Sequence, residues 1–394
     1  MKLSNFLFLV VFLALYGCLE PFTPHLNESG DSFLVVDGII TDQPGPYTVK
    51  ITKSAGIDEE TEFVSGVDMS IEEENGVVES LTEVSDGVYQ TIGMQGVEGR
   101  RYRLNFNYLG QQYQSAWQKI YASPVIDSIY YKAEKRGTTG KDNDVYGVQF
   151  FIANHGAEDG TKYFRFEWDE TWRIGVARGI TDDYVGRDSI TPTTKVFNTT
   201  CWKSAETRSL NLGTTLGLSK NLLSGHKLGF ITGEEARFTR KYSTLVKQYT
   251  LSEEEYLFWK YLKEANEEIG GLFGKQPAKV VSNVTNISNP GETILGYFSA
   301  SGLSEKRIYV GTANLPFELI ANPSCPVQTY LKEDLMEDYE LTLLQSIENG
   351  NLFFRLLFLE DDPEIVSGAE VTSLRCVDCV ANGGTNIKPD FWEE

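Results

Sequence analysis

Apolar and polar residues alternate with a period of two along much of this chain, and this alternation restricts the fold more than any other feature. Tyr102, Leu104, Phe106 and Tyr108 alternate with polar or charged neighbours, and the stretch from Arg240 to Thr250 has the longest alternating run. Because successive side chains of a strand point to opposite faces of a sheet, the pattern predicts half-buried β-strands. We therefore expect a mainly β protein.

Short strands separated by turn-forming residues follow one another from residue 33 to about residue 120. Their spacing predicts an immunoglobulin-like β-sandwich over residues 33–121. Gly99 followed by Tyr102 resembles the tyrosine corner of such sandwiches, in which the phenol fixes a loop to the sheet. Ala122-Ser123-Pro124 marks the junction with a larger, β-sandwich-like domain that we expect over residues 122–394.

One amphipathic helix is expected in the second domain, over residues 252–269. Ser252 and Glu255 form a capping box, the pair that satisfies free backbone donors at a helix start. Apolar side chains from Leu257 to Ile269 then recur at helical spacing, which is typical of a packing face rather than of a ligand site. A second, shorter helix is expected over residues 340–347.

The N-terminus is typical of an export signal that ends in a lipid attachment site. An uncharged apolar run from Phe6 to Tyr16 follows Lys2 and is shorter than the roughly 20 residues that span a bilayer. Leu15-Tyr16-Gly17-Cys18 resembles a bacterial lipobox. Residues 1–17 are therefore expected to be a signal peptide, Cys18 to carry acyl chains such as palmitate, and residues 18–32 to be an extended tether. The alternative is an ordinary secretory signal that happens to end beside a cysteine.

Four cysteines follow Cys18 in the chain. In an exported protein, Cys201, Cys325, Cys376 and Cys379 are expected to form disulfides, for which three pairings exist. We favour the pairings that join Cys376 and Cys379 separately to Cys201 and Cys325, which would hold the C-terminal tail against the second domain. A redox motif or half a zinc site is the alternative for the Cys376-x-x-Cys379 spacing, but the chain has no second closely spaced pair.

Several segments match one family jointly. They are Cys18-Leu19-Glu20-Pro21-Phe22, residues 34–41 and 44–49, Cys201-Trp202, residues 242–259 and 295–301, residues 376–379 and Lys388-Pro389-Asp390-Phe391-Trp392. Together they resemble an uncharacterised lipoprotein family of Bacteroidota, the domain-of-unknown-function family four-two-four-nine. The resemblance implies an outer-membrane lipoprotein that faces the cell exterior and accompanies a TonB-dependent receptor of the glycan-importer type, as an accessory or lid-like subunit.

Two further sequence features concern the cell surface. Asp127-Ser128-Ile129 and Asp188-Ser189-Ile190 resemble the O-glycosylation site of exported Bacteroidota proteins, so Ser128 and Ser189 are predicted modification sites. Surface-exposed lipoproteins of this phylum usually have several acidic residues after the lipidated cysteine, whereas here only Glu20 lies close to it. The orientation thus stays open between the exterior and the periplasm.

The chain carries no recognisable catalytic motif. Its three histidines, His25, His155 and His226, have no second histidine at ligand spacing, and no GxSxG elbow nominates a nucleophile. With 56 acidic against 35 basic residues, the net charge of −21 disfavours nucleic-acid binding. We expect no metal and no cofactor.

Aromatic residues offer the remaining binding hypothesis. Trp168, Trp172, Tyr184 and Trp202 are candidates for a platform on which a sugar or peptide stacks, with core packing as the alternative. The sequence thus predicts a non-enzymatic cell-surface lipoprotein that serves a TonB-dependent receptor or another outer-membrane β-barrel in substrate capture. A stand-alone glycan- or protein-binding module is the alternative, and a hydrolase is a third, weaker hypothesis.

Overall fold

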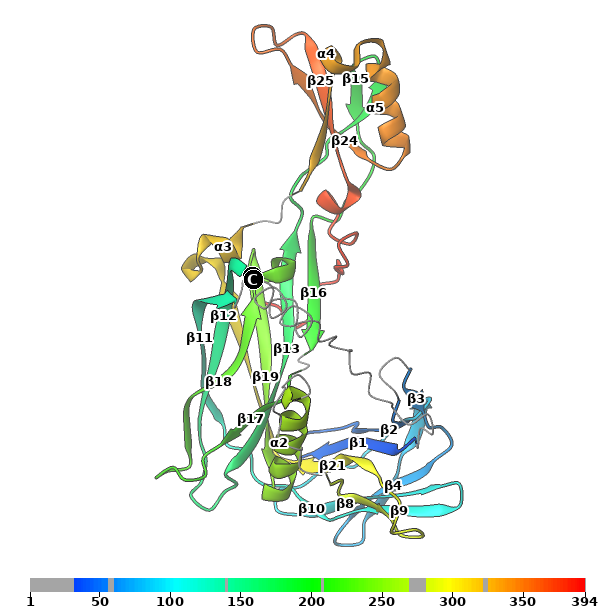
Figure 1. The fold of residues 1–394 in the computed structure, drawn as a ribbon, viewed down its shortest axis with the longest axis vertical. Helices are drawn as coiled ribbons and strands as arrows, with labels where there is room; N and C mark the ends of the chain where they lie inside the picture. The colour runs from blue at the N-terminus through cyan, green and yellow to red at the C-terminus, as the bar shows by residue number, and fades with distance from the viewer. Residues whose placement is uncertain are drawn as a thin grey trace, which may run out of the picture.

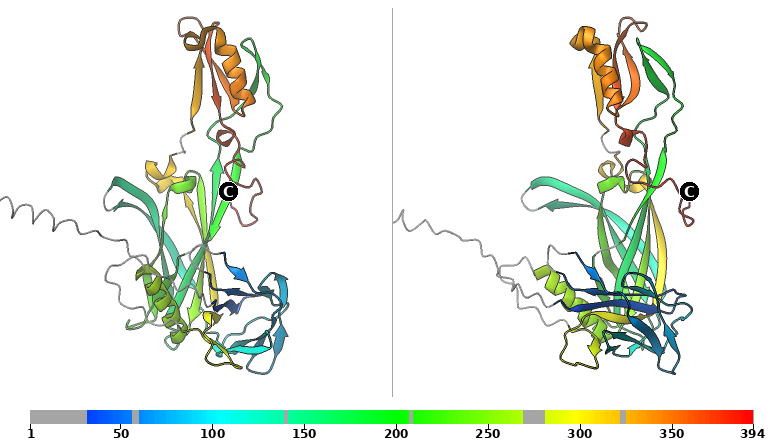
Figure 2. Two further views of the ribbon diagram at one scale, coloured as in Figure 1. Left: turned by 45° about the vertical axis from the view of Figure 1, so that its right-hand side comes forward. Right: turned by 90° about the vertical axis from the view of Figure 1, so that its right-hand side faces the viewer.

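A computed structural model describes residues 32–55, 60–138, 141–206, 209–268, 281–321 and 325–393. The chain is mainly β, as the alternation predicts, and forms three bodies (Figure 1). We call them the N-terminal sandwich, the central sandwich and the distal module. The N-terminal sandwich and the distal module lie at opposite ends of the central sandwich (Figures 1 and 2). Residues 1–31, which contain the predicted signal peptide, Cys18 and most of the tether, lie outside the described residues.

Two sheets form the N-terminal sandwich. One has the strand order β21 (Leu295–Ser301), β1 (Leu34–Thr41), β2 (Thr48–Lys53), β7 (Val88–Gln90) and β6 (Thr82–Ser85), with β3 (Glu62–Phe63) paired to β2. The other has the order β20 (Val284–Asn286), β9 (Gln111–Ser115), β8 (Arg101–Tyr108), β4 (Asp68–Glu73) and β5 (Val78–Ser80), with β10 (Gln118–Lys119) paired to β8. Alternate residues such as Leu104 and Phe106 point into the shared core, as expected for a half-buried strand.

Tyr102 forms the predicted contact between sheet and loop. It is fully buried, and its phenol oxygen accepts a hydrogen bond of 2.9 Å from the backbone N–H of Val97, five residues upstream. Burial raises the pKa of this phenol above its ordinary value.

The boundary of the first domain differs from the sequence prediction. Strands β20 and β21 lie within the range 122–394 that we assigned to the second domain, yet they complete the N-terminal sandwich, where β21 pairs in parallel with β1. Phe298 and Ala300 of β21 enter its core. At Gly296, which has φ of 84°, an added Cβ would lie 1.9 Å from the carbonyl oxygen of Val36, so only glycine fits. Alternation shows that a segment is a strand but does not identify its partner, and this partner is about 260 residues away along the chain.

Longer strands build the central sandwich. One sheet has the order β11 (Ile126–Thr138), β12 (Lys141–His155) and β18 (Leu222–Thr232). The other has the order β16 (Thr200–Glu206), β13 (Tyr163–Gly175), β19 (Lys241–Leu251) and β22 (Leu303–Gly311), with β17 (Asn211–Thr214) paired to β13. Phe164, Phe166, Trp172 and Tyr242 lie between the sheets, and Leu319 of the short helix α3 (Phe317–Ile320) joins them.

Helix α2 (Glu253–Glu268) lies where the central and N-terminal sandwiches meet (Figures 1 and 2). Its start agrees with the sequence prediction, because the hydroxyl of Ser252 accepts a hydrogen bond of 3.1 Å from the backbone N–H of Glu255. The second predicted contact of the capping box, from the Glu255 side chain back to the helix start, does not form. The Glu255 side chain turns inward and contacts Ser299 and Trp259 instead of the helix start. No helix among the described residues is long and apolar enough to cross a membrane.

The sequence predicts one larger domain over residues 122–394, whereas the structure shows the distal module as a body of its own beside the central sandwich. It combines the hairpin β14 (Asp182–Gly186) and β15 (Ser189–Pro192) with the sheet β23 (Val327–Leu331), β25 (Val366–Thr372) and β24 (Leu352–Phe358), and with helices α4 (Lys332–Leu335) and α5 (Tyr339–Glu348). Helix α5 confirms the second predicted helix. The module has its own core, which consists of Tyr184, Tyr339, Leu343, Phe353, Ala369 and Val371.

Two disulfides hold the neck between the distal module and the central sandwich. Cys201 of β16 bonds to Cys379, and Cys325 bonds to Cys376, which is one of the two arrangements that the sequence favoured. Cys201, Cys376 and Cys379 are buried. Each bond therefore joins the C-terminal tail to a segment that is distant in the sequence.

The last residues of the chain fasten onto the outer face of the central sandwich. Trp202 and Thr385 exchange two backbone hydrogen bonds of 2.9 Å, and Trp392 packs edge-on against the rings of Trp202 and Tyr309. Trp392 is only 3% exposed. The guanidinium group of Arg307 lies 3.6 Å from the ring centre of Phe391. The tail therefore acts as a packed strap across this sheet.

Removing the Trp392 side chain should release this strap. We expect Trp392→Ala to lower the free energy of unfolding by about 3 kcal/mol, because a buried indole is lost and its neighbours cannot collapse fully into the space. The measurement is chemical denaturation of the disulfide-bonded protein. Ile387→Ala in the same tail is the control, since this side chain is 74% exposed, and its change should stay within about 0.5 kcal/mol. Equal effects of the two substitutions would contradict the packed strap.

Candidate functional site

A groove of about 650 Å³ lies where helix α2 meets the edge of the N-terminal sandwich. We call it the junction groove. Its walls come from the start of β8, from the segment of β10 and its flanks, from α2 and from the segment that leads into β20. The lining residues are Arg101, Ala116, Trp117, Gln118, Lys119, Tyr121, Ser252, Glu254, Leu257, Phe258, Tyr261, Val281, Ser282, Asn283 and Tyr297.

The floor of the junction groove is aromatic and well packed. Phe258 of α2 and Tyr297 of β21 are 6% and 5% exposed, and their ring centres lie 4.8 Å apart. The Tyr297 hydroxyl donates a hydrogen bond of 3.3 Å to the side-chain oxygen of Gln118. Burial, followed by the nearby Glu255 carboxyl, raises the pKa of Tyr297 well above its ordinary value. The predicted apolar stripe of α2 therefore both packs the junction and shapes the groove.

Exposed aromatic and charged side chains form the rim. Trp117 is 36% exposed, and Tyr121 and Tyr261 are partly exposed beside it. Lys119 and Arg101 are register partners on the antiparallel strands β10 and β8, so their side chains lie on one face of the sheet. The rim thus combines ring surfaces with two neighbouring cations.

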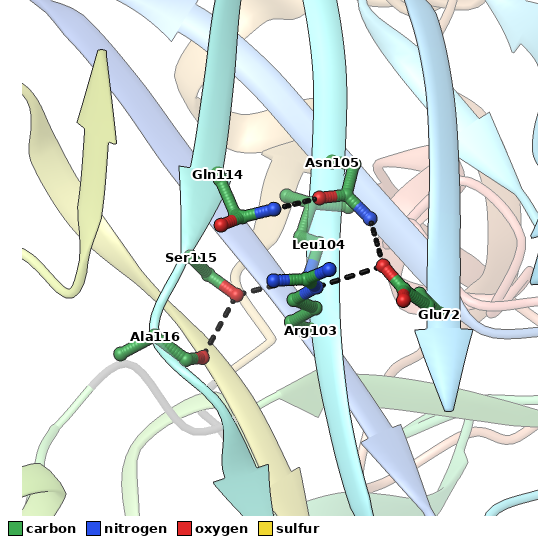
Figure 3. Close-up of polar contacts among 7 residues, drawn as sticks. All are labelled: Glu72, Arg103, Leu104, Asn105, Gln114, Ser115 and Ala116. Atoms are coloured by element: carbon green, nitrogen blue, oxygen red, sulfur yellow. Dashed lines mark hydrogen bonds and ion pairs between the residues drawn. The ribbon is translucent and has the colours of Figure 1, made fainter. Parts of the chain in front are cut away.

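A chain of polar contacts crosses the outer face of the adjoining sheet (Figure 3). Gln114 donates to Asn105 at 2.7 Å, Asn105 donates to Glu72 at 3.0 Å, and Arg103 donates to the same Glu72 oxygen at 2.7 Å. We call these four residues the polar network. The hydrogen bonds from Arg103, above all, and from Asn105 lower the pKa of the Glu72 carboxyl.

Trp117 connects the polar network to the junction groove. The Arg103 guanidinium lies 4.4 Å from the centre of the Trp117 ring, which itself lines the groove. The neighbouring backbone is also fixed, because the Ser115 hydroxyl accepts the N–H of Leu104 at 2.9 Å and donates to the carbonyl of Ala116 at 3.0 Å (Figure 3). The planar polar groups and the indole therefore form one continuous surface.

The carboxyl of Glu255 lies buried near the groove floor, with 1% of the residue exposed. One of its oxygens accepts hydrogen bonds from the Ser299 hydroxyl at 2.6 Å and from the Trp259 indole N–H at 3.2 Å. Ser299 belongs to β21, so this contact joins the central and N-terminal sandwiches. Burial raises the pKa of Glu255, and the charge of the nearby Arg165 offsets the shift only in part.

A second hollow, of about 1120 Å³, lies beside β13 and β16. It contains Glu170, which is 7% exposed and lies 3.2 Å from the Nε of Arg237, whose guanidinium also lies 4.9 Å from the centre of the Trp172 ring. Burial raises the pKa of Glu170, and the charge of Arg237 opposes that shift. Glu170 and Arg237 are buried and paired with each other, whereas the rim groups of the junction groove are open to a ligand. We therefore take the junction groove as the candidate site.

The four aromatic residues proposed from the sequence do not form a binding platform. Trp168 and Trp172 are 6% and 1% exposed in the core of the central sandwich, Trp202 is 8% exposed beneath the C-terminal strap on its outer face, and Tyr184, at 8%, belongs to the separate core of the distal module. A sugar needs an exposed ring face on which to stack, so the stacking hypothesis is wrong for these residues and core packing accounts for them. Two sheets packed face to face bury the rings of Trp168 and Trp172 on their inner faces, whereas the C-terminal tail covers Trp202.

Other predicted site residues lie away from the groove. Ser128 on β11 and Ser189 on β15 are both exposed, and the modification itself stays a prediction. His155 contacts Asp127 at 2.8 Å at the surface, and His226 contacts Asn211 at 2.9 Å. Within the described ranges, no group of three or more His, Cys, Asp or Glu side chains could hold a metal ion.

The sequence did not reveal Trp117, Lys119 and Tyr261 as site residues. A tryptophan in a β-rich chain is usually buried, so the exposure of Trp117 could be known only from the fold. Tyr261 was read as part of a packing stripe, which holds for its neighbour Phe258. The approach of α2 to β10 brings these residues together, and no local pattern encodes that contact.

Comparison with known proteins gives one family and no assigned chemistry. The model of the family described as Domain of unknown function (DUF4249) matches residues 19–307. No curated protein matches the chain. Among solved structures, the chain is similar to the crystal structure of a DUF4785 family protein from Legionella pneumophila, with 12% identity over 55% of this chain and 51% of that chain. The chain thus matches about half the length of that structure, and the TM-score of 0.17 supports no argument about fold or function.

The buried Glu255 carboxyl should make stability depend on pH. Because its pKa is raised in the folded state, stability is lost as the pH rises from the ordinary glutamate value, about 4.3, through the folded value. Glu255→Gln keeps an oxygen acceptor for Ser299 and Trp259 but cannot ionise. We therefore expect the free energy of unfolding of the variant, minus that of the unmodified protein, to increase as the pH rises above about 4.3.

Denaturation at several pH values measures this difference. Glu170 also has a raised pKa, but it is present in both proteins, so its contribution to the pH dependence cancels in the difference. Glu254→Gln is the matched control because Glu254 is exposed on the same helical turn. The free energy of unfolding of Glu254→Gln, minus that of the unmodified protein, should vary less with pH. A Glu255→Gln difference that stays constant over the range would contradict a raised pKa for Glu255.

Proposed function

The chain belongs to the family described as Domain of unknown function (DUF4249), and from that membership and the junction groove we propose a non-enzymatic binding role at the outer membrane. In this proposal the protein is anchored by lipid at Cys18 and faces the cell exterior. It is an accessory or lid-like subunit of a TonB-dependent receptor or another outer-membrane β-barrel, and the junction groove holds substrate on its way to the barrel.

The junction groove is the observation that carries the proposal. Its floor is rigid and apolar, and its rim presents aromatic faces and cations, which is the composition typical of ligand sites. Glu255 and Tyr297, the groups with raised pKa near the floor, are both engaged in hydrogen bonds: Glu255 binds Ser299 across the junction of the two sandwiches, and Tyr297 binds Gln118 within the N-terminal sandwich. They support the shape of the site, so the arrangement favours binding over bond breaking.

The order of the three bodies fits a protein held at its N-terminus. The first described strand, β1, lies in the N-terminal sandwich, and the distal module lies at the far end of the molecule (Figure 1). The predicted tether of residues 18–32 spans at most about 50 Å when fully extended. An anchor at Cys18 would therefore keep the groove close to the membrane and let the distal module project away from it.

A stand-alone glycan- or protein-binding module is the alternative. The polar network favours it, because a half-buried, preorganised surface beside the groove can recognise a ligand without a barrel. Direct affinity of the isolated protein for a ligand, combined with the absence of any bound barrel, would support this alternative.

Replacement of the lipid-bearing residue should release the protein from the membrane. We expect Cys18→Ser to abolish incorporation of labelled palmitate and to move the protein from the membrane fraction to the soluble fraction, because the thiol is the acceptor of the acyl chains. Leu19→Ala, which keeps the cysteine, is the control and should stay in the membrane fraction. Unchanged labelling of Cys18→Ser would exclude this attachment site.

The proposed partner can be tested by co-purification. After extraction in a mild detergent at native expression level, the protein should elute with a large outer-membrane β-barrel, which mass spectrometry identifies. The matched control is extraction of a strain that produces Cys18→Ser, in which the complex should be depleted. Isolation of the lipidated protein only as a free monomer would count against the accessory role and in favour of the stand-alone module.

A further inference from the structure

We propose that the ligand of the junction groove is an oligosaccharide that carries a carboxylate group. This inference rests on the proposed function, in which the groove is the ligand site. In this proposal, aromatic ring faces stack on the sugar, two cations bind the carboxylate, and the polar network binds hydroxyl groups.

The rings at the rim suit a flat ligand with apolar faces. Trp117 is 36% exposed, and Arg103 packs 4.4 Å from its ring centre, which restrains the indole. Tyr261 lines the groove from the side of α2, above the buried Phe258. A pyranose ring has C–H groups on its faces and hydroxyls at its edge, so it can lie on aromatic surfaces while its polar edge reaches other groups.

Charge complementarity indicates an anionic ligand. The chain has a net charge of −21, yet the groove lining contains Lys119 and Arg101 against one acidic residue, Glu254. Within the described part of the chain, Lys119 pairs with no carboxylate, and its ammonium lies 5.3 Å from the centre of the Tyr121 ring. Arg101 reaches Glu74 only at 3.9 Å, with both side chains largely exposed. Both cations are therefore available to a carboxylate from outside.

The polar network offers a second set of contacts next to these cations. Gln114, Asn105, Glu72 and Arg103 are half-buried and hold one another through hydrogen bonds of 2.7 to 3.0 Å. Side chains that are already fixed lose little conformational entropy when a ligand binds. The Glu72 charge is compensated by Arg103, so this part of the surface suits neutral hydroxyls, while the ligand carboxylate belongs at Arg101 and Lys119.

The test compares two trisaccharides that differ by their carboxylates, trigalacturonate and trigalactose, by calorimetry on the full mature chain in detergent. Trigalacturonate should bind at least about tenfold more tightly, because hydrogen bonds to charged groups contribute more than neutral ones. Its affinity should fall as salt is added. The double variant Arg101→Gln/Lys119→Gln should bind both sugars with the affinity that the unmodified protein has for trigalactose. Trp117→Ala should lower the affinity for both sugars.

Lys260→Gln is the matched control. It removes one positive charge from α2, where Lys260 lies 3.9 Å from Glu264 and does not line the groove, so it should leave both affinities unchanged. The thermal midpoint of each variant confirms that it folds.

Equal affinity for the two sugars in the unmodified protein would overturn the assignment of a carboxylate. Displacement by inorganic phosphate, together with no effect of Trp117→Ala, would show a simple anion site and overturn the saccharide. If neither sugar binds and the barrel still co-purifies, the ligand class is wrong while the proposed accessory role stands. If neither sugar binds and no barrel co-purifies, both proposals fail.

Discussion

The side chains of one buried strand, β19, hold together two crossings of the chain between the two sandwiches. The Thr250 hydroxyl donates to the carbonyl of Tyr121 at 2.9 Å and accepts the N–H of Gly302 at 2.9 Å. Gln248 donates to the carbonyl of Pro124 at 2.7 Å. Both side chains are fully buried, and a buried backbone group without a partner costs about 1–3 kcal/mol. The polar face of β19 thus satisfies the backbone at both points where the chain passes from the N-terminal sandwich to the central one, at residues 121–124 and at Gly302.

This crossing makes the parallel pairing of β1 with β21 attainable. Parallel neighbours need a long connection, and here that connection contains the other strands of the N-terminal sandwich, most of the central sandwich and helix α2. The chain returns to the central sandwich at Gly302. An added Cβ there would lie 2.2 Å from the carbonyl oxygen of Tyr121, so the close approach requires glycine. Since β21 carries Tyr297 and Ser299, the same return places the groove floor against α2. The shape of the candidate site therefore follows from the crossing.

Local patterns sufficed for the elements but not for their partners. Alternation predicted β8 and β19, the Ser252 cap predicted the start of α2, and Tyr102 predicted a contact between loop and sheet that Val97 supplies. The polar residues of β19 alternate like any others, and nothing nearby in the sequence shows that Gln248 and Thr250 bind the chain at residues 121–124 and 302. The groove also forms by contacts between segments that are distant in the sequence. For that reason no local pattern identifies Trp117 as a site residue. Of the aromatics that stood out in the sequence, Trp168, Trp172 and Tyr184 belong to cores, and Trp202 lies beneath the C-terminal strap.

The distal module shows why the disulfides lie where they do. Its core contains six buried residues, and a unit of that size buries too little apolar surface to be strongly stable alone. Cys325 and Cys376 close a loop with a sequence separation of 51, which in the chain-entropy account stabilises the folded state by about 4 kcal/mol. Their bond joins the two ends of the segment that forms the sheet and its helices.

Cys376 also fixes the module to its neighbour. Its carbonyl accepts the N–H groups of Ala177 and Arg178, at 3.2 and 3.1 Å, from the segment that runs from β13 to the hairpin. Three residues later, Cys379 joins the tail to Cys201 of β16. A module with a small core is thereby held in place by covalent bonds at its base. Its position relative to the central sandwich is thus determined at the neck.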